Sequence, residues 1–398
     1  MPGGLLNLRA SPNQAGAFYG LFYSGQFVLL GVQLPFFAGW LHLNGFTAPE
    51  IGLITGAALI ARLTFGPFIA FWADHQDDER RSLRYVSFLF ALGAVSLLIA
   101  PGKLLIGAAA AVVIWTFGLL VPLTDTAVLR ADRNGWLHYG QTRAAGSFVF
   151  LSTTLIGGAL LTRIGVAYAV WVMAAAGAFA FLMSLLLPHG AGGRGGAKPV
   201  SWREAPKLLA SPVFLAVLFS AGLTQGAHAV YYALSYLRWE AIGYSELTIG
   251  CLWATGVTAE IIVLTRARGL AHRFAPSMLL ALAGAAAAVR WTITALEPPL
   301  WVLFLTQVLH AFTFAAAYLG AIEFLDRAAP TRLVTTGMTV MSATGVGAIT
   351  GLATVVSGYV WNAAGPSSAY FMMAAMGAGA FVIALLVARL WDGGRIIE

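Results

Sequence analysis

Eight ionisable side chains interrupt long apolar tracts of this sequence, and their positions are the first clue to its chemistry. They are Arg62, Asp125, Arg143, His228, Glu260, Arg290, His310 and Glu323. If the tracts span a bilayer, a charge at the centre costs about 2.5–3.5 kcal/mol, so it persists only when it is paired, faces water or has a function. We therefore expect these side chains to include groups that bind a solute or carry protons.

Arginine, glutamate and histidine offer different chemistry at such positions. Arg62 and Arg290 cannot lose their protons to escape the cost of burial, so they suit the binding of an anion. The carboxyl group of Glu260 can take up and release a proton in an apolar site. His228 and His310 can titrate near neutral pH. The alternatives are a fixed salt bridge for Arg62 and simple interhelical hydrogen bonds for the two histidines.

Three of the eight residues lie near the ends of their tracts, where structural explanations stay open. Asp125 stands about one turn before Arg130 and can pair with it near the surface. Arg143 can extend its guanidinium group to the membrane interface. Glu323, close to Arg327, is expected at a solvated helix end.

Catalytic and metal-binding patterns are missing from the sequence. It holds no HExxH, paired CxxC, Walker A or GxSxG sequence, and Cys251 is its one cysteine. We therefore expect no catalytic residues, no metal site, no cofactor and no enzyme activity.

The composition is that of a polytopic membrane protein. Charged residues make up 10% of the 398 residues and hydrophobic residues 59%, whereas a soluble domain has roughly 25% charged residues. A spanning helix needs roughly 20 apolar residues, and tracts of that length recur along the whole chain. The expected spans are 14–40, 47–72, 82–100, 104–129, 144–163, 167–187, 211–238, 246–266, 276–296, 300–325, 333–361 and 367–390.

Lysine and arginine residues are distributed unevenly between the connections. With the N-terminus in the cytoplasm, the tails and the even-numbered connections hold 18 of the 23 Lys and Arg residues. The other side holds only Lys103, Arg163 and Arg238. Cytoplasmic loops are enriched in Lys and Arg, so both termini are expected in the cytoplasm. The net charge of +7 then faces anionic lipid and requires no nucleic-acid partner.

The two halves of the chain are related. A glycine- and proline-rich basic segment, 188–210, separates residues 1–187 from 211–398, so we expect two six-helix bundles joined by a cytoplasmic linker. A shift of 198 residues aligns GFTAPEIGLITGAALIARL (45–63) with GYSELTIGCLWATGVTAEI (243–261). The same shift pairs Arg62 with Glu260, and Asp125 with Glu323. Secondary transporters are often built from such repeats, with the solute site between the halves.

The segment between the second and third expected spans resembles the signature of the major facilitator superfamily. This signature has a glycine, then an aspartate three residues later, a base, a further glycine and a basic pair. The stretch AFWADHQDDERR (70–81) keeps Asp74 and the pair Arg80–Arg81. The positions that depart from the signature are Ala70, His75 and Asp77.

Further stretches in both halves resemble the phenylpropionate permease branch of this superfamily. They are VPLTDTA (121–127), YGQTRAAGS (139–147), QGAHAVYY (225–232), residues 243–261, VRW (289–291) and QVLHAFTF (307–314). The resemblance covers nearly the whole chain. It implies an all-α fold of twelve transmembrane helices, a monomer in the bacterial inner membrane, and proton-linked import of an aromatic carboxylate such as 3-phenylpropionate. It also implies a gating role for Asp74, Arg80 and Arg81.

The more distant lactose permease resembles this sequence in the spacing of its site residues. An acid in its helix 4 and an arginine eighteen residues later match Asp125 and Arg143, which implies substrate contacts for both. Its helix 9 arginine and helix 10 histidine match Arg290 and His310. The lactose permease glutamate three residues after that histidine is replaced by Thr313. Another group must therefore carry the proton, and Glu260 is the first choice, before His310.

These residues together favour an anionic substrate. We expect Arg62 or Arg290 to bind its carboxylate, Asp125 and Arg143 to line the inner end of the cavity, and His228 and Trp253 to contribute further contacts. A second hypothesis pairs Glu260 with Arg143 when the inner side is closed. The alternatives are a proton-linked nucleoside or sugar importer, a drug exporter, and a receptor-like relative that moves no solute.

Overall fold

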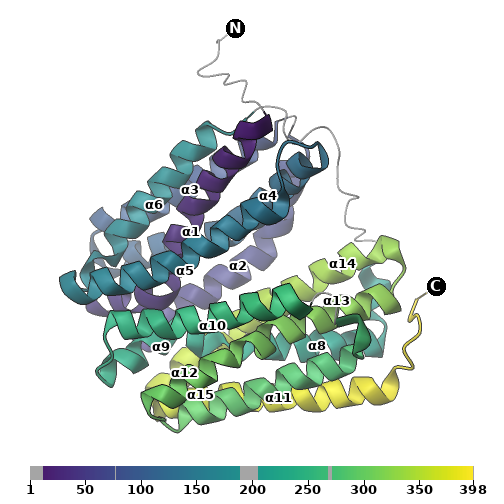
Figure 1. Cartoon of the computed structure of the whole chain (residues 1–398). Helices are drawn as coiled ribbons and strands as arrows, with labels where there is room; N and C mark the ends of the chain where they lie inside the picture. Colours follow the sequence, from purple (N-terminus) through teal and green to yellow (C-terminus); the bar gives the residue numbers. More distant parts are fainter. Residues whose placement is uncertain (1–11, 77, 189–204, 268–270, 398) are drawn as a thin grey trace. The chain divides into compact units, whose positions relative to one another are not determined.

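The computed structural model describes residues 12–76, 78–188, 205–267 and 271–397, and helices dominate throughout this part of the chain (Figure 1). No strand occurs among these residues. The all-α fold expected from the sequence is therefore confirmed.

The helices up to the predicted linker follow the expected spans closely. Their bounds are α1 Pro12–Leu43, α2 Ala48–Asp74, α3 Glu79–Ile99, α4 Gly102–Arg133, α5 Tyr139–Ile164, the 3-10 turn η1 Val166–Tyr168 and α6 Ala169–Leu185. Asp78 caps α3 by accepting a hydrogen bond from the backbone N–H of Arg80, and Gly165, with φ of 94°, ends α5. A side-chain cap and a glycine in the left-handed region are common helix boundaries.

The later helices are more often interrupted. Their bounds are α7 Ala205–Leu209, α8 Pro212–Gly226, α9 Ala229–Ala241, α10 Glu246–Ala267, η2 Ala271–Arg273, α11 Pro276–Ala295, α12 Leu300–Val308, η3 Phe312–Ala316, α13 Ala317–Ala328, α14 Thr331–Met341, η4 Ser342–Ile349 and α15 Thr350–Leu390. The segments η3 and η4 are π-helical. Pro212 and Pro276 stand in the first turns of α8 and α11, where proline costs no hydrogen bond.

Eleven helical stretches among the described residues are long and apolar enough to cross a membrane. The last of them, Leu333–Leu390, contains Gly365, whose φ of 85° and ψ of 168° are not helical. This glycine divides the stretch into the two last spans expected from the sequence. The expected span 211–238 consists of α8 and α9, which meet at Ala227 and His228.

The chain divides into two compact units. The first unit comprises Met1–Phe46, Thr64–Ala197 and Glu240–Gly250, and the second comprises Thr47–Leu63, Lys198–Trp239 and Cys251–Glu398. The N-terminal part of α2 thus belongs to the second unit, and the start of α10 belongs to the first. Residues 189–204 of the predicted linker lie outside the described residues.

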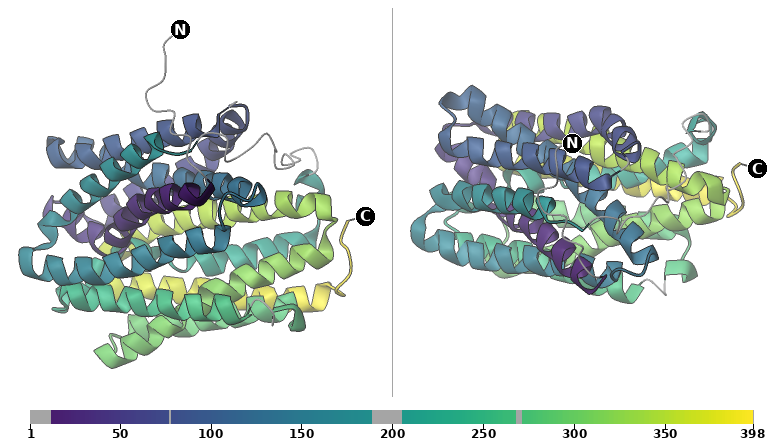
Figure 2. Two further views of the ribbon diagram at one scale, coloured as in Figure 1. Left: turned by 45° about the horizontal axis from the view of Figure 1, so that its top comes forward. Right: turned by 90° about the horizontal axis from the view of Figure 1, so that it is seen from above.

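Within the first unit, α1 packs against α5 and α6, and α3 packs against α4 and α6 (Figure 2). Small residues permit close approach: a Cβ atom added to Gly25 would lie 2.8 Å from the Cβ of Ala180.

Within the second unit, α15 packs along both α11 and α8 (Figure 2). A buried cluster of large side chains, which includes Phe214, Phe324 and Leu325, fills one end of this unit. The segment Thr47–Leu63 packs on α15 through glycines: a Cβ atom added to Gly56 would lie 2.5 Å from the carbonyl oxygen of Gly351.

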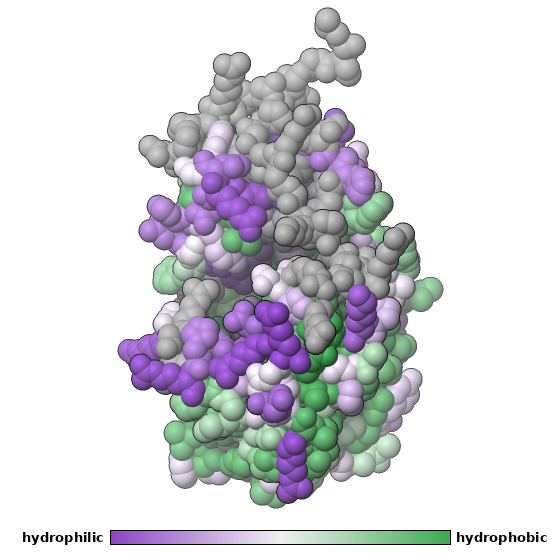
Figure 3. Space-filling view, turned by 90° about the vertical axis from the view of Figure 1, so that its right-hand side faces the viewer, coloured by the Kyte–Doolittle hydropathy of each residue, from purple (hydrophilic) through white to green (hydrophobic). Residues whose placement is uncertain are grey.

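Large apolar side chains cover much of the helix sides. Phe68, Phe71, Ile99 and Leu104 are each more than 60% exposed, which suits contact with lipid tails. Figure 3 looks at the helix ends on the right of Figure 1, where hydrophilic side chains (purple) gather beside hydrophobic ones (green). Apolar sides with polar ends are the surface expected of a multi-pass membrane protein.

Candidate functional site

A polar cluster in the second unit is centred on Arg290 of α11. Its side chain is fully buried. Nη1 donates to Nδ1 of His310 at 3.0 Å, and Nη2 donates to Oε1 of Gln307 at 2.8 Å. The planar fork of the guanidinium group therefore holds two side chains of the neighbouring helical segment at once.

Irregular backbone brings the partners of Arg290 into place. Gln307 lies near the end of α12, and His310 lies in the short segment between α12 and the π-helix η3. His228 lies in the break between α8 and α9. A π-helical turn shifts the side chains that follow it relative to a regular helix, and such turns are frequent at functional sites.

The bond from Arg290 fixes the tautomer of His310. A guanidinium group has only donors, so Nδ1 of His310 must accept and carries no proton. Neutral His310 then bears its proton on Nε2, which lies 3.3 Å from Oε2 of Glu260 in α10. Glu260, His310 and Arg290 thus form a continuous polar chain across three helices.

His228 extends this chain through Thr313, the residue that stands where lactose permease has a glutamate. Nδ1 of His228 donates to the carbonyl oxygen of Thr224 at 3.0 Å, and Nε2 lies 2.9 Å from Oγ1 of Thr313. The rings of His228 and His310 are 5.3 Å apart. Thr313 occupies a hydrogen-bonding position next to both histidines.

Aromatic rings surround the buried guanidinium group. Its Cζ atom lies 4.8 Å from the ring centroid of Tyr231 and 4.2 Å from that of Trp291. Trp253 stacks on Tyr231 at 4.2 Å and is only 2% exposed. The faces of these two rings partly stabilise the positive charge of Arg290. Trp253 packs against the ring of Tyr231.

Three donors in this aromatic cluster find no acceptor among the described residues. They are Nε of Arg290, Nε1 of Trp253 and Nε1 of Trp291. Buried polar atoms usually have a partner, so such groups call for water or a ligand that accepts hydrogen bonds.

Arg62, in the part of α2 that belongs to the second unit, differs from Arg290. It is half-buried, and no described residue forms a hydrogen bond, ion pair or ring contact with it. The fixed salt bridge considered from the sequence is therefore not found among the described residues. Neither Arg62 nor Arg290 contacts a carboxylate there.

A separate cluster in the first unit joins α1, α4 and α5. Oδ1 of Asp125 accepts a hydrogen bond from the hydroxyl group of Tyr23 at 2.5 Å and forms an ion pair with Nε of Arg143 at 3.3 Å. The guanidinium group of Arg143 lies 4.8 Å from the ring centroid of Phe27. The structure thus brings together the acid and the arginine that share the eighteen-residue spacing.

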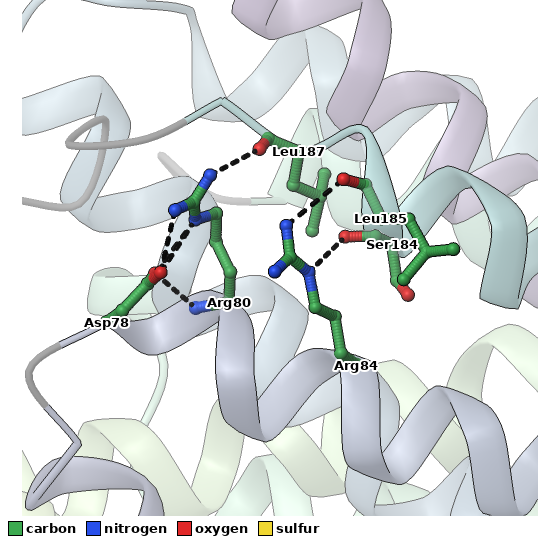
Figure 4. Close-up of polar contacts among 6 residues, drawn as sticks. All are labelled: Asp78, Arg80, Arg84, Ser184, Leu185 and Leu187. Atoms are coloured by element: carbon green, nitrogen blue, oxygen red, sulfur yellow. Dashed lines mark hydrogen bonds and ion pairs between the residues drawn. The ribbon is translucent and has the colours of Figure 1, made fainter. Parts of the chain in front are cut away.

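The signature segment is described at two of its three expected gating residues, Arg80 and Arg81. Arg80 pairs with Asp78 at 2.7 Å and donates to the carbonyl oxygen of Leu187 at 3.3 Å (Figure 4). Asp74 is the last residue of α2, and its side chain lies outside what the structure describes. Arg81 is exposed.

The expectation of a solvated end for Glu323 is wrong. Its side chain is 6% exposed, and its two oxygens lie 2.6 Å from Nδ1 of His272 and 3.3 Å from Nη2 of Arg327. The residue lies near the end of its span, but α13 turns it inward toward the segment that precedes α11.

Sequence reasoning missed Gln307, Tyr23 and the hydrogen bond of Thr313. Gln307 could have been recognised from the sequence, because an amide side chain three residues before His310 is unusual in an apolar tract. Tyr23 had none, because its partner Asp125 lies 102 residues away.

Comparison with known proteins supports a transporter. The family model described as "MFS_1 like family" matches residues 17–372. The chain is 29% identical over 365 residues to the probable 3-phenylpropionic acid transporter of Escherichia coli (strain K12), an alignment that covers 88% of this chain and 92% of that protein. It is 27% identical over 351 residues to the maltose permease of Geobacillus stearothermophilus, covering 85% and 86%.

Solved structures agree on the fold. The nucleoside transporter NupG matches with a TM-score of 0.78 at 16% identity, covering 95% of this chain and 99% of that chain. At such low identity the likeness concerns the fold alone. Because the family model spans most of the sequence, this chain belongs to the MFS_1 like family and is a multi-pass membrane transporter of the major facilitator type.

Proposed function

We propose that this protein is a secondary transporter of the bacterial inner membrane that imports a small, preferably aromatic, carboxylate together with protons. The observation that carries the proposal is Arg62, a cation within a span that has no partner among the described residues. A charge left unpaired in such a place is costly, and an anionic substrate would compensate it.

The charge balance of the other ionisable groups supports an anion. Asp125 lies beside Arg143 and Glu323 beside Arg327, whereas the carboxyl group of Glu260 contacts a neutral His310. The two arginines without a carboxylate contact, Arg62 and Arg290, therefore leave an excess of one positive charge even when Glu260 is ionised. This positive charge would repel a cationic drug, which needs acidic side chains at its binding site.

Of the two arginines, Arg62 is the better candidate for the substrate carboxylate. Arg290 is fully buried and already donates to His310 and Gln307. Arg62 is half-buried and has its donors free of described partners. In this proposal Arg290 positions His310, and Arg62 binds the substrate.

Glu260 is the better candidate for the proton carrier. His310 cannot bind a second proton while its Nδ1 accepts from Arg290, because both ring nitrogens of a charged histidine are donors. The carboxyl group of Glu260 can be protonated without breaking that bond. His310 then acts as the residue that positions Glu260.

The name of the relative in Escherichia coli supports 3-phenylpropionate as the first substrate to test. The unsatisfied donors of Trp253, Trp291 and Arg290 favour a molecule with several acceptors, which a sugar has. A sugar is the second candidate, because one relative is a maltose permease. Nucleosides, an alternative left open by the sequence, belong in the same panel of substrates.

The test is uptake of labelled 3-phenylpropionate into proteoliposomes, with and without an inward proton gradient. We expect uptake that the gradient stimulates and that unlabelled monocarboxylates inhibit. Inhibition by maltose or nucleosides, without inhibition by carboxylates, would contradict the proposed substrate class. Uptake unaffected by the gradient would contradict proton coupling.

The matched variants at the proposed carboxylate site are Arg62→Gln and Arg62→Lys. Hydrogen bonds to charged groups contribute about 1.5–3 kcal/mol, so R62Q should lower uptake at subsaturating substrate by roughly 10-fold or more. R62K keeps the charge and should retain part of the activity. Equal activity of R62Q and the unaltered protein would remove Arg62 from the site.

A further inference from the structure

A hollow of about 350 Å³ lies on the side of the first unit between α3 and α6. The residues that line it are Arg81, Arg84, Tyr85 and Phe88 of α3 and Phe181 of α6. None of them belongs to the clusters around Arg62, Asp125 or Arg290. The hollow is therefore separate from the proposed substrate site.

The lining residues of α3 follow one helix face from polar to apolar. Positions three and four residues apart lie on the same side of a helix, so Arg81, Arg84, Tyr85 and Phe88 form a stripe. The two arginines stand at the start of the helix, and Phe88 lies about two turns further along. Tyr85 is 62% exposed and Phe88 48% exposed, so this stripe faces the surroundings of the protein.

The guanidinium groups give the hollow a positive charge. Arg84 donates to the carbonyl oxygens of Ser184 and Leu185, at 3.3 and 3.1 Å (Figure 4). These neutral groups hold the arginine in place but do not cancel its charge. Arg81 forms no ion pair or hydrogen bond with any residue that the structure describes.

Among the neighbouring acidic side chains that the structure describes, Asp78 does not cancel this charge either. Asp78 is engaged by the guanidinium group of Arg80, with hydrogen bonds of 2.7–3.0 Å. The hollow is therefore flanked by a pair that is already neutral and contains two further positive charges.

The apolar part of the hollow is built from both helices. The rings of Phe88 and Phe181 meet at 5.6 Å between centroids, at an angle of 64°. Tyr85, between the arginines and the phenylalanines, contacts the ring of Trp72 at 5.7 Å. A tyrosine at this level is typical of the membrane interface, where one end of the ring is apolar and the other is hydrated.

We propose that this hollow binds an anionic phospholipid of the cytoplasmic leaflet. The phosphate would lie between Arg81 and Arg84, the glycerol and ester groups beside Tyr85, and the start of an acyl chain against Phe88 and Phe181. Basic pockets between transmembrane helices at the cytoplasmic side bind anionic headgroups in this way. The arginine distribution assigns this end of α3 to the cytoplasm.

A phospholipid fits better than free phosphate because the same hollow joins two cations to exposed aromatic rings. Free phosphate would contact only the arginines and would make no contact with the apolar half of the hollow. A zwitterionic lipid would gain the apolar contacts but less from the two positive charges. The proposal therefore predicts that the headgroup determines which lipid binds more tightly and that the acyl chain adds to the affinity.

The experiment counts lipids bound to the purified, delipidated full-length protein by native mass spectrometry. Phosphatidylglycerol and phosphatidylcholine with identical acyl chains are titrated in parallel. A basic residue near the surface contributes enough to change binding about fivefold. We expect Arg81→Gln to weaken phosphatidylglycerol binding by about that factor and to weaken phosphatidylcholine binding less, and Arg81→Lys to restore most of the difference.

Two matched variants separate this site from general charge and general hydrophobicity. Arg389, near the end of α15, is also exposed, so Arg389→Gln removes the same charge elsewhere and should leave the tightest phosphatidylglycerol site intact. Phe88→Ala should weaken both lipids.

Three outcomes would overturn the proposal. The first is equal binding of the two lipids to the unaltered protein. The second is an equal loss of phosphatidylglycerol binding in R81Q and R389Q. The third is displacement of the lipid by inorganic phosphate at a concentration equal to that of the lipid, which would indicate a site for the free anion. None of these outcomes depends on whether the protein transports a carboxylate.

Discussion

Arg290 shows how a single charged residue can be kept inside a membrane protein without a carboxylate beside it. Its two terminal nitrogens donate to His310 and Gln307, and its plane lies against the rings of Tyr231 and Trp291. A lysine could not replace it, because an ammonium group lacks the flat face and the fixed fork. The guanidinium group in turn determines which nitrogen of His310 faces Glu260.

The pair formed by Glu260 and His310 leads to a prediction about coupling. Glu260→Gln keeps an oxygen that can accept from Nε2 of His310, but it cannot take up a proton. We expect E260Q to lose stimulation of uptake by a proton gradient while exchange of labelled for unlabelled substrate persists. Paired measurements of gradient-driven uptake and exchange in the same proteoliposomes check this.

The matched control for E260Q is Asp125→Asn, which removes a carboxylate that already contacts Arg143. We expect D125N to weaken both uptake and exchange, since Asp125 is expected from the sequence to line the inner end of the substrate cavity. Full gradient stimulation in E260Q would show that another group carries the proton.

At the scale of helices, regular and irregular segments have different tasks. The helices α11 and α15 approach closely along their length through small residues, whereas α8, α12 and α14 end beside His228, η3 and η4. The polar cluster of the second unit is built at two of these interruptions. Close-packed regular helices thus provide a rigid support for side chains that irregular segments position.

The contact between α11 and α15 gives a prediction about stability. A Cβ atom added to Gly284 would lie 2.5 Å from the backbone nitrogen of Phe381. The two helices must separate to accept it, and overpacking of this kind costs about 1–3 kcal/mol. We expect Gly284→Ala to lower the Tm in detergent by several degrees.

Gly20 in α1 is the matched control for Gly284, because an added Cβ atom there meets nothing within 4 Å. Alanine is favoured over glycine in a helix by about 1 kcal/mol. Gly20→Ala should therefore leave the Tm unchanged or raise it slightly. An equal loss of stability in both variants would show that the close approach at Gly284 does not limit stability.

At the scale of the whole molecule, the distribution of basic residues makes a prediction about orientation. Fusion of alkaline phosphatase after Glu398 should give an inactive enzyme, and fusion of green fluorescent protein there should give fluorescence, since both termini are expected in the cytoplasm. A phosphatase fused in the connection between α3 and α4, next to Lys103, should be active. The reverse pattern of phosphatase activity and fluorescence would show that the termini lie on the other side of the membrane.

Two statements about the whole chain, its domain boundaries and the pairing of Glu260 with Arg143, remain predictions. Residues 189–204 of the linker are outside the described part of the chain, so the boundaries 1–187, 188–210 and 211–398 rest on the sequence. The pairing of Glu260 with Arg143 concerns a conformation with the inner side closed. In the structure Glu260 contacts His310, and Arg143 contacts Asp125.

The sequence by itself determined the spans, the family and the identity of most polar residues of the site. Hydropathy is a local property, so the expected spans agree with the observed helices, and even the break between the last two follows from Gly365 and Pro366. The resemblance to lactose permease, and not the spacing alone, associated Asp125 with Arg143, and the structure pairs them.

Only the tertiary structure decided which of these polar residues meet. Tyr23 reaches Asp125 across 102 residues, and Thr313 reaches His228 across 85. The burial of Glu323 depends on the segment around His272, which no local pattern relates to it. Side-chain partners follow from how distant helices pack and from where π-helical turns shift their faces, and a hydropathy pattern contains neither.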